Sequence, residues 1–323
     1  MKIFLAGENY KEKIIRKFAD EAIFSGGGGF PDEVNNENLF GKSTYNTEIP
    51  KRATNGDYPI RGGMFDEVNN ENIHSRHSSM WGGKAEYYSN AIKQHKPYIL
   101  ESFYYADETT ERLLPYFGDF LLDSGAFTFM QNSKKGVAWE EYIERYAAFI
   151  NRNNIEKFFE LDIDSIVGYD KVLEYRKHLE RLTNKPVIPV WHISRGIDNF
   201  YKMCDEYSYV ALGGIVGERR SGTKYKQYHA AFPHFINEAH KRNAKIHGLG
   251  YTDLNGLTVN HFDSVDSTAW TTGNRFGFVY QFNGKTMIKH DVPKGKRLAD
   301  SRKVALINYT EWIKFQKYAE KHL

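Results

Sequence analysis

The sequence has a single cysteine, Cys204, among its 323 residues. One thiol excludes an intramolecular disulfide and any zinc site that needs several thiolates, although sites built from His and carboxylates stay open. No apolar run is long enough to span a bilayer, and the apolar stretch after Met1 is too short for a secretory signal. These absences predict a cytoplasmic protein with no structural zinc and no membrane partner.

The sequence also has little net charge, with a formal value of only +3. It is unevenly distributed, however: residues 284–323 hold ten Lys or Arg against four Asp or Glu, and the rest of the chain is slightly acidic. A basic C-terminal extension of this kind suits phosphate contacts, and a solvated helix face gives the same pattern. Candidate nucleic-acid contacts are Trp270, Arg275, Lys294, Lys296 and Arg297, with core packing as the alternative role of the tryptophan.

Eight short apolar segments have the composition of β-strands, and most of them precede a helical pattern. They are Lys2–Ala6, Pro97–Glu101, Phe120–Ser124, Phe158–Asp162, Val187–His192, Tyr209–Gly213, Lys245–Gly250 and Phe262–Ser267. Alternating strands and helices are typical of parallel sheets, and eight such units favour closure into a barrel. We therefore expect an α/β fold, a (β/α)8 TIM barrel over residues 1–283.

Helical periodicity is clearest between the third and fourth predicted strands. Five large side chains repeat there at helical spacing: Trp139, Tyr142, Ile143, Tyr146 and Ile150. Further helices are predicted at 170–182, at 226–242, where Pro233 should kink or split the helix, and from about Ser301 onward. Asn283-Gly284 between two apolar runs predicts a hairpin.

Residues 25–83 form the least barrel-like stretch and predict a loop insertion after the first strand. The insertion contains a near-repeat, since residues 32–38 (DEVNNEN) recur as residues 66–72. Its acidic residues lack the pattern of an EF-hand loop, and His74 and His77 have no identifiable third ligand. A solvated loop is the interpretation favoured over a metal site.

Polar residues end several of the predicted strands. They are Asp123 and Ser124, Asp162 and Asp164, His192, Gly213 and Gly214, and Asp266. The carboxyl ends of all strands of a barrel lie on one face, and the active sites of such barrels lie on that face. Two converging carboxylates can divide the work of nucleophile and general acid, as in retaining glycosyl transfer, whereas each aspartate alone could be a cap or turn residue.

Four motifs in this region resemble those of a known family. Residues 123–127 (DSGAF) are similar to Asp-Ser-Gly-Gly-Phe, residues 211–218 (ALGGIVGE) to Gly-Gly-Leu-Ala-Val-Gly-Glu, and residues 247–250 (HGLG) to Met-Gly-Val-Gly, followed by an aspartate on the last strand. This set resembles the tRNA-guanine transglycosylases and their relatives that act on DNA in phages and bacterial modification islands. The resemblance covers roughly residues 120–270 and also implies a TIM barrel.

The resemblance implies roles for the base-binding residues. Asp123 and Ser124 would touch the base, with Asp123 also assisting proton transfer, and Asp162 would read the guanine edge, with Asp164 as a competitor for that role. Gly213 and Gly214 would offer backbone amides to the base carbonyl, and Glu218 would support their loop. His192 stands where the family has a glutamine, so its role is either base contact or a hydrogen-bonded core residue.

The nucleophile has two candidates, because Phe262-Asp263-Ser264 and Val265-Asp266-Ser267 both resemble the family's Phe-Asp-Cys. The count from Gly250 is 13 residues to Asp263 and 16 to Asp266, and the family interval is nearer the longer one. The two positions differ in strand parity, so only one side chain can point into the site of a regular strand. We favour Asp266 and keep Asp263 as the alternative.

The family's tRNA enzymes hold a zinc with three cysteines and a histidine, which one cysteine cannot supply. The resemblance therefore implies DNA as the polymer and a DNA-guanine transglycosylase that inserts a free 7-deazaguanine without a cofactor. The alternatives are a tRNA enzyme, a non-catalytic nucleic-acid-binding subunit or an unrelated barrel hydrolase of nucleosides. A duplex target would need flipping, which leaves open a helicase-like partner, and a phage-encoded protein would act in the host cytoplasm.

Overall fold

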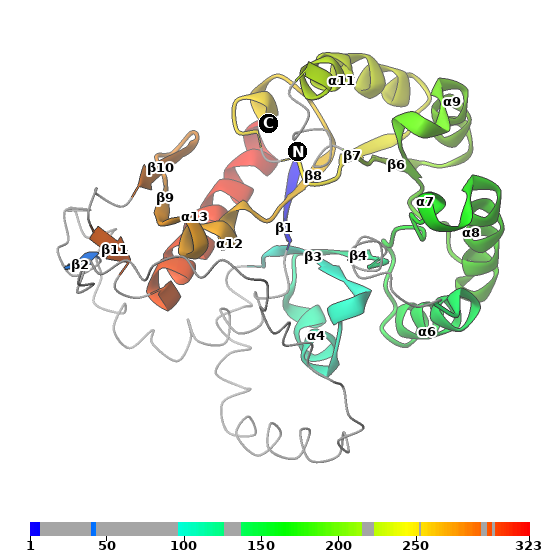
Figure 1. Cartoon of the computed structure of the whole chain (residues 1–323), viewed down its shortest axis with the longest axis horizontal. Helices are drawn as coiled ribbons and strands as arrows, with labels where there is room; N and C mark the ends of the chain where they lie inside the picture. The colour runs from blue at the N-terminus through cyan, green and yellow to red at the C-terminus, as the bar shows by residue number, and fades with distance from the viewer. Residues whose placement is uncertain are drawn as a thin grey trace, which may run out of the picture.

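The computed structural model describes residues 1–6, 40–42, 96–125, 137–214, 223–251, 253–291, 296–298 and 301–323. Its centre is a seven-stranded parallel sheet in the order β4-β3-β1-β8-β7-β6-β5. The strands are β1 (Lys2–Ala6), β3 (Tyr98–Ser102), β4 (Asp119–Asp123), β5 (Val190–Trp191), β6 (Tyr209–Leu212), β7 (Lys245–Gly248) and β8 (Ser264–Ser267). The sheet curls into a half-barrel (Figure 1), an arrangement compatible with a TIM-like fold.

Seven of the eight predicted strands are confirmed, and the predicted strand Phe158–Asp162 is not formed as such. This segment makes two isolated parallel bridges instead, Phe158 with Leu122 of β4 and Phe159 with Ile188. Ile188 lies two residues before β5, and Pro189 between them has no N–H to donate. The carbonyl of Pro189 accepts from the amide of Ala211, so the missing donor faces β6 and shortens β5 on that side. On the other side the amide of Val190 donates to the side-chain Oε1 of Glu160, so the ladder between residues 158–162 and β5 does not continue past the bridge at Ile188.

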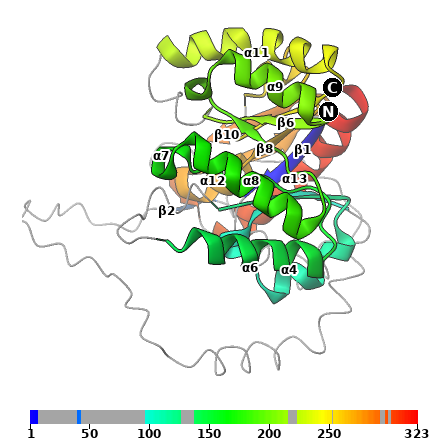
Figure 2. The same cartoon turned by 90° about the vertical axis from the view of Figure 1, so that its right-hand side faces the viewer.

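Helices lie along the outside of the curled sheet (Figures 1 and 2). The principal ones are α4 (Glu108–Leu113), α6 (Trp139–Arg152), α8 (Tyr169–Thr183), α9 (Ile197–Glu206) and α11 (Thr223–Lys241). Shorter helical turns are η2 (Phe103–Tyr105), η3 (Leu114–Tyr116), α7 (Asp164–Val167), η4 (Ile193–Arg195) and η6 (Gly256–Thr258). The five large side chains predicted to share one face of α6 are all buried, which confirms the amphipathic pattern.

Pro233 does not split the predicted helix, and α11 continues through it from Thr223 to Lys241. Pro233 removes a helical hydrogen bond at a cost of about 3 kcal/mol. The neighbouring Phe232 and Ile236 are 0% and 4% exposed in the core beneath the helix. Burial of two large side chains contributes enough to offset that cost.

The chain ends in α12 (Ala269–Phe276), the hairpin β9 (Phe278–Phe282) and β10 (Met287–Asp291), and α13 (Ser301–His322). The hairpin turns at Asn283-Gly284 as predicted, and Gly284 has a positive φ of 92°. Gln316 of α13 donates to the carbonyls of Ile3 and Tyr98, and Trp312 is buried against the core. The boundary predicted at residue 283 thus falls within the hairpin, and the helix beyond it packs on β1 and β3.

Most of the predicted insertion 25–83, including both copies of the near-repeat, His74 and His77, lies outside the described residues. Its described part is β2 (Phe40–Lys42), which pairs antiparallel with β11 (Lys296–Leu298). Within the ranges that the structure describes, no helix has the length and apolar character needed to cross a membrane.

The inner face of the curled sheet positions the site. One apolar cluster joins alternate residues of successive strands: Phe4, Ala6, Leu100, Leu121, Phe159, Ile188, Val190 and Ala211. The strand residues between these inner ones, such as Ile3 and Val210, belong to the apolar cluster under the helices instead. Because side chains alternate along a strand, residues two positions beyond these inner residues also face inward. Asp123, His192 and Gly213 are at such positions, two residues beyond Leu121, Val190 and Ala211.

Candidate active site

A cavity of about 640 Å³ opens at the carboxyl ends of the strands. The described residues that line it are Asp162, Asp164, Ser165, His192, Ile193, Ser194, Gly213, Gly214 and Tyr228. Five of the residues predicted to bind a base are in this list, drawn from the ends of three successive sheet segments. Its volume lies within the range of small-molecule sites. Asp123 and Asp266 are not among the lining residues, although the charges of Asp162 and Asp266 both act on Asp123.

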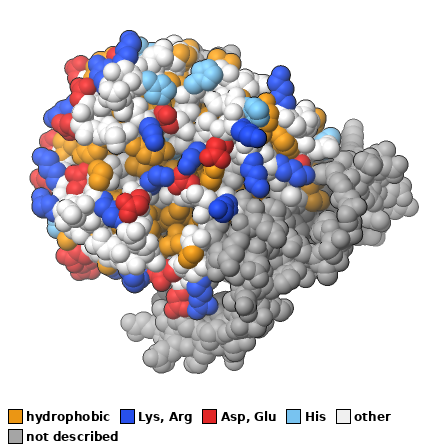
Figure 3. All heavy atoms as spheres, turned by 180° about the vertical axis from the view of Figure 1, so that it is seen from behind, with side chains coloured by type: hydrophobic (Ala, Val, Ile, Leu, Met, Phe, Trp, Pro, Cys, Tyr) orange, Lys and Arg blue, Asp and Glu red, His pale blue; other side chains and the backbone are white. Residues whose placement is uncertain are grey.

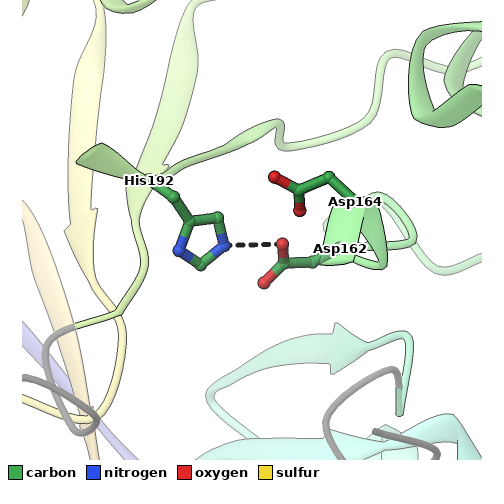
Figure 4. Close-up of side chains that lie close together, drawn as sticks. All are labelled: Asp162, Asp164 and His192. Atoms are coloured by element: carbon green, nitrogen blue, oxygen red, sulfur yellow. Dashed lines mark hydrogen bonds and ion pairs between the residues drawn. The ribbon is translucent and has the colours of Figure 1, made fainter. Parts of the chain in front are cut away.

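His192 and Asp162 form a close pair at the wall of the cavity (Figure 4). Nε2 of His192 lies 2.6 Å from Oδ1 of Asp162. Burial on its own lowers the pKa of His192, but the hydrogen bond and the negative charge of Asp162 outweigh it, so the pKa is raised above its ordinary value.

The imidazole of His192 packs on the backbone of Gly213 and Gly214. A Cβ atom on Gly213 would lie 2.4 Å from Cε1 of His192 and 2.8 Å from Cγ1 of Val190. Gly214 has a positive φ of 76°, which favours glycine. The glycine pair that the resemblance expects to offer amides to a base therefore also makes room for the histidine ring. The hydroxyl of Tyr228 donates to the carbonyl of Gly213 at 2.9 Å and fixes that turn.

Arg195 holds the carboxylates beside this pair, although the sequence patterns did not single it out. Its side chain is 1% exposed, and its guanidinium donates to Asp164 through Nε (3.3 Å) and Nη2 (3.0 Å) and to Asp162 through Nη2 (3.3 Å). Its remaining Nη1 donates to the fully buried Glu160 at 2.6 Å and to the carbonyl of Val190. The arginine thus ties three carboxylates together.

Glu160 was also missed as a functional residue. Nε of Arg176 donates to its other oxygen at 2.6 Å, and the amide of Val190 donates to Oε1 at 2.8 Å. Burial raises the pKa of Glu160, but the two guanidinium groups lower it by more, so the pKa is below its ordinary value. Burial also raises the pKa of Asp164, but the hydrogen bond and the charge of Arg195 lower it by more, so this pKa too is below its ordinary value. Both side chains are therefore held as carboxylates.

Asp123 at the end of β4 has the opposite electrostatic environment. Burial raises the pKa of its carboxyl to about 6, and the negative charges of Asp162 and Asp266 add to this, while the amide of Gly125 donates to Oδ2 at 2.9 Å and opposes it. Among the described residues no Lys or Arg pairs with Asp123. The neighbouring Ser124 is 1% exposed, and its carbonyl accepts from Tyr142.

Asp266 lies on β8 and is 6% exposed. The amide of Gly250 donates to its Oδ1 at 2.6 Å, and Nε2 of His247 lies 3.2 Å from the same oxygen. Nδ1 of His247 lies 2.6 Å from the hydroxyl of Ser264, which also bonds Tyr209. His247 was quoted only as part of a motif, yet it orients the predicted nucleophile. Within the described residues no donor reaches Oδ2 of Asp266.

Asp263 lies at the opposite end of the strand from Asp266. It precedes β8, its carbonyl accepts from the amide of Lys2, and its carboxylate accepts from the amide of Ile246 at 2.8 Å. Nε2 of His240 lies 2.9 Å from the same carboxylate oxygen. These contacts place Asp263 near the amino ends of β1 and β7, away from Asp123 and the cavity.

The predicted nucleic-acid contacts have different outcomes. Trp270 is fully buried and donates from its indole to the carbonyl of Ala6, which agrees with core packing, the alternative role of this tryptophan. Glu218 and Lys294 lie outside the described residues, and only the backbone is described at Arg275, Lys296 and Arg297. On the face seen in Figure 3, basic and acidic side chains are interspersed.

Asp162, Asp164 and His192 form the one group of three His, Cys, Asp or Glu residues, within the described ranges, that is close enough to hold a metal. Their ligand atoms lie within 4.8 Å of one another. However, the Arg195 guanidinium already binds both oxygens of Asp164 and one of Asp162. A fixed positive charge at this place competes with a cation, so the donor set does not fit a metal.

Comparisons of the chain with protein-family models, with curated proteins and with solved structures find no match.

Proposed function

We propose that the chain is a DNA-guanine transglycosylase, which exchanges guanine in DNA for a free 7-deazaguanine such as 7-cyano-7-deazaguanine. One observation carries the proposal. Asp123 ends β4, Asp266 lies on β8 and Asp162 follows the bridges of Phe158 and Phe159, and in addition to burial the charges of Asp162 and Asp266 raise the pKa of Asp123. Carboxylates in unlike environments at the strand ends near a cavity of small-molecule size are what a retaining glycosyl transfer uses.

The proposal includes an eight-stranded barrel. Residues 158–160 supply the eighth segment, since Phe159 donates its amide to Leu122 of β4 at 3.0 Å and Glu160 donates to Ile188 at 3.1 Å. These bonds run on both sides of the segment, between the two outer strands of the seven-stranded sheet. A barrel closed in this way would bring the carboxyl ends of all its strands to one face.

In the first step Asp266 attacks C1′ of the target deoxyguanosine through Oδ2. The C1′–N9 bond breaks as the C1′–O bond forms, and the leaving guanine takes a proton from the carboxyl of Asp123. The hydrogen bonds of Gly250 and His247 to Oδ1 of Asp266 orient the other oxygen for attack. The product is a covalent glycosyl ester on the enzyme.

In the second step the incoming 7-deazaguanine attacks C1′ through N9. Its N9 proton passes to the carboxylate of Asp123, the ester bond breaks, and Asp266 is released as a carboxylate. Two inversions at C1′ restore the original anomer. No cofactor takes part, because every proton and electron pair is supplied by the two carboxyl groups and the two bases.

Incubation of the purified chain with labelled guanine and either DNA or tRNA tests this function. We expect label in DNA, in single strands more than in duplex, because a paired target must first leave the helix. Label in tRNA alone would show that the polymer substrate is tRNA and not DNA. Absence of label from both, together with binding to either one, would indicate a non-catalytic nucleic-acid-binding subunit.

A further inference from the structure

A row of hydrogen-bonded polar side chains crosses the inside of the curled sheet on β6, β7 and β8. Tyr209, the first residue of β6, bonds the hydroxyl of Ser264, and Oγ of Ser264 lies 2.6 Å from Nδ1 of His247. Nε2 of His247 lies 3.2 Å from Oδ1 of Asp266. These four residues, which we call the polar row, connect the amino end of β6 to the proposed nucleophile.

The polar row lies among apolar side chains of the inner face. The ring of His247 is 0% exposed, and its centroid lies 6.3 Å from that of Phe4 and 5.4 Å from that of Phe159, which both belong to the inner apolar cluster. Replacing both members of a buried hydrogen bond by apolar groups of the same shape costs little stability. Stability alone therefore does not explain the polar row, whereas an effect on Asp266 does.

The carboxylate of Asp266 fixes the direction of every hydrogen bond in the polar row. An ionised carboxylate only accepts, so Nε2 of His247 donates to Asp266. In the neutral ring Nδ1 then accepts, which requires the hydroxyl of Ser264 to donate to it and to accept in turn from Tyr209. Ser264 thereby selects the tautomer of His247 that carries its proton on Nε2.

Oδ1 of Asp266 accepts two hydrogen bonds, one from His247 and one from the amide of Gly250 at 2.6 Å. Attack on the sugar through Oδ2 turns Oδ1 into an ester carbonyl oxygen, which is a weaker acceptor than a carboxylate oxygen. The two donors therefore stabilise the free carboxylate more than the ester. They favour departure of Asp266 from the sugar over its attack on the sugar.

We propose that His247 is a positioning residue for the second step of the exchange, where its Nε2–H holds Oδ1 of Asp266 and assists release of the carboxylate. In that step N9 of the incoming base attacks C1′ and gives its proton to Asp123. The C1′–Oδ2 bond breaks, and its electron pair leaves with Asp266. The negative charge that forms is shared by both oxygens, and His247 stabilises it at Oδ1. This inference rests on the proposed base exchange.

Single-turnover measurements on the full chain separate the two steps. The protein is incubated with single-stranded DNA, the covalent adduct is quantified by mass spectrometry, and labelled guanine is then added to follow release of the adduct. In His247→Leu the carboxylate loses a donor that stabilises it more than the ester. We expect the ratio of adduct to free enzyme at equilibrium to rise about tenfold and release to slow about tenfold.

Further variants test whether the effect passes through the hydrogen bond. His247→Gln places an amide N–H near the position of Nε2, so it should restore most of the release that His247→Leu loses. Ser264→Ala removes the hydroxyl that selects the tautomer, so it should slow release in the wild-type background and have no such effect in the His247→Gln background. His240→Leu is the matched control, because His240 pairs with Asp263 (2.9 Å) away from the cavity, and both steps should keep their wild-type rates.

Nitrogen-15 NMR of the full chain with labelled histidine reads the tautomer directly, since the signal that is absent from His247→Gln belongs to His247. We expect a protonated Nε2 and an unprotonated Nδ1 in the wild type. Ser264→Ala should lower the fraction of this tautomer. A proton on Nδ1 in the wild type would overturn the inference, because the hydrogen bond from Ser264 would then run in the other direction.

A purely structural role of His247 predicts a different kinetic result, since a displaced Asp266 would attack and leave more slowly and the adduct would decrease. A decreased or unchanged adduct in His247→Leu therefore rejects the inference alone, provided that the wild type transfers labelled guanine into DNA. If His247→Leu does not fold, the same measurements on Ser264→Ala decide. Absence of both adduct and label with the wild type rejects the base exchange and, with it, the inference.

Discussion

Replacement of Asp123 by asparagine should stabilise the protein at alkaline pH and abolish base exchange. Burial raises the pKa of Asp123 from 3.8 to about 6, and nearby negative charges add to the effect. Because the raised pKa belongs to the folded state, its stabilising effect is full below pH 3.8, declines as the pH rises, and is lost above about pH 6. The ionised side chain then costs about 3 kcal/mol relative to its protonated form.

Asparagine removes this cost and keeps the local turn, because its amide oxygen can still accept from Gly125. Asp123→Asn should therefore gain about 3 kcal/mol at pH 8 and about half of that at pH 5, as the two pKa values require. The free energy of unfolding in denaturant at these two pH values gives the comparison. Labelled-guanine exchange, measured on the same preparations, should be absent because asparagine has no proton to give.

Asp119 at the other end of β4 is the matched control. Burial raises its pKa, but Lys157 and Lys2 bind its carboxylate at 2.6 and 2.7 Å and lower it by more. A lowered folded-state pKa stabilises above the unfolded value and is lost as the pH falls, so Asp119→Asn should lose about 1 kcal/mol at pH 8. Destabilisation by Asp123→Asn as well, equal at both pH values, would show that Asp123 is only a turn residue and refute the reasoning.

Three further outcomes follow from the proposed mechanism. Asp266→Ala should remove the covalent adduct seen by mass spectrometry of the protein with DNA, whereas Asp263→Ala should retain it; the opposite pattern would reverse the choice of nucleophile. The exchange rate should fall about tenfold per pH unit above the Asp123 pKa of about 6, and a rate that rises there would exclude Asp123 as the acid. In Gly213→Ala the new Cβ would lie 2.4 Å from His192, so displacement of the ring should weaken 7-cyano-7-deazaguanine in calorimetry, and an unchanged affinity would contradict this packing.

Regular elements of the fold could be predicted from periodicity because their burial is regular. The strand Lys2–Ala6 has the predicted bounds, and the five-residue face of α6 is buried. The failures occur where single residues override the pattern. The side chain of Glu160 takes the amide of Val190 and ends the pairing of the predicted strand Phe158–Asp162, and the packing of Phe232 keeps α11 intact through Pro233.

The alternation of side chains along a strand predicts which residues lie at the candidate site and which do not. It correctly separates Asp263 from Asp266, because three residues of extended chain carry the two side chains to different places. Parity cannot reveal partners that follow a strand in a turn. Arg195 comes after His192 in a 3-10 turn, and its hydrogen bond to Asp162 depends on how that turn folds back.

The carboxylates at this end of the sheet fall into two electrostatic classes, and the division bears on function. Arg195 and Arg176 neutralise Glu160, and Arg195 neutralises Asp164, with a lowered pKa in each. Asp123 has no such partner among the described residues, and its pKa is raised to about 6. A network that served stability alone would gain by pairing every buried carboxyl, since an unpaired one costs free energy. An acid that must hold a proton near neutral pH needs the unpaired environment, so the division favours acid–base chemistry at Asp123 over a structural ion cluster.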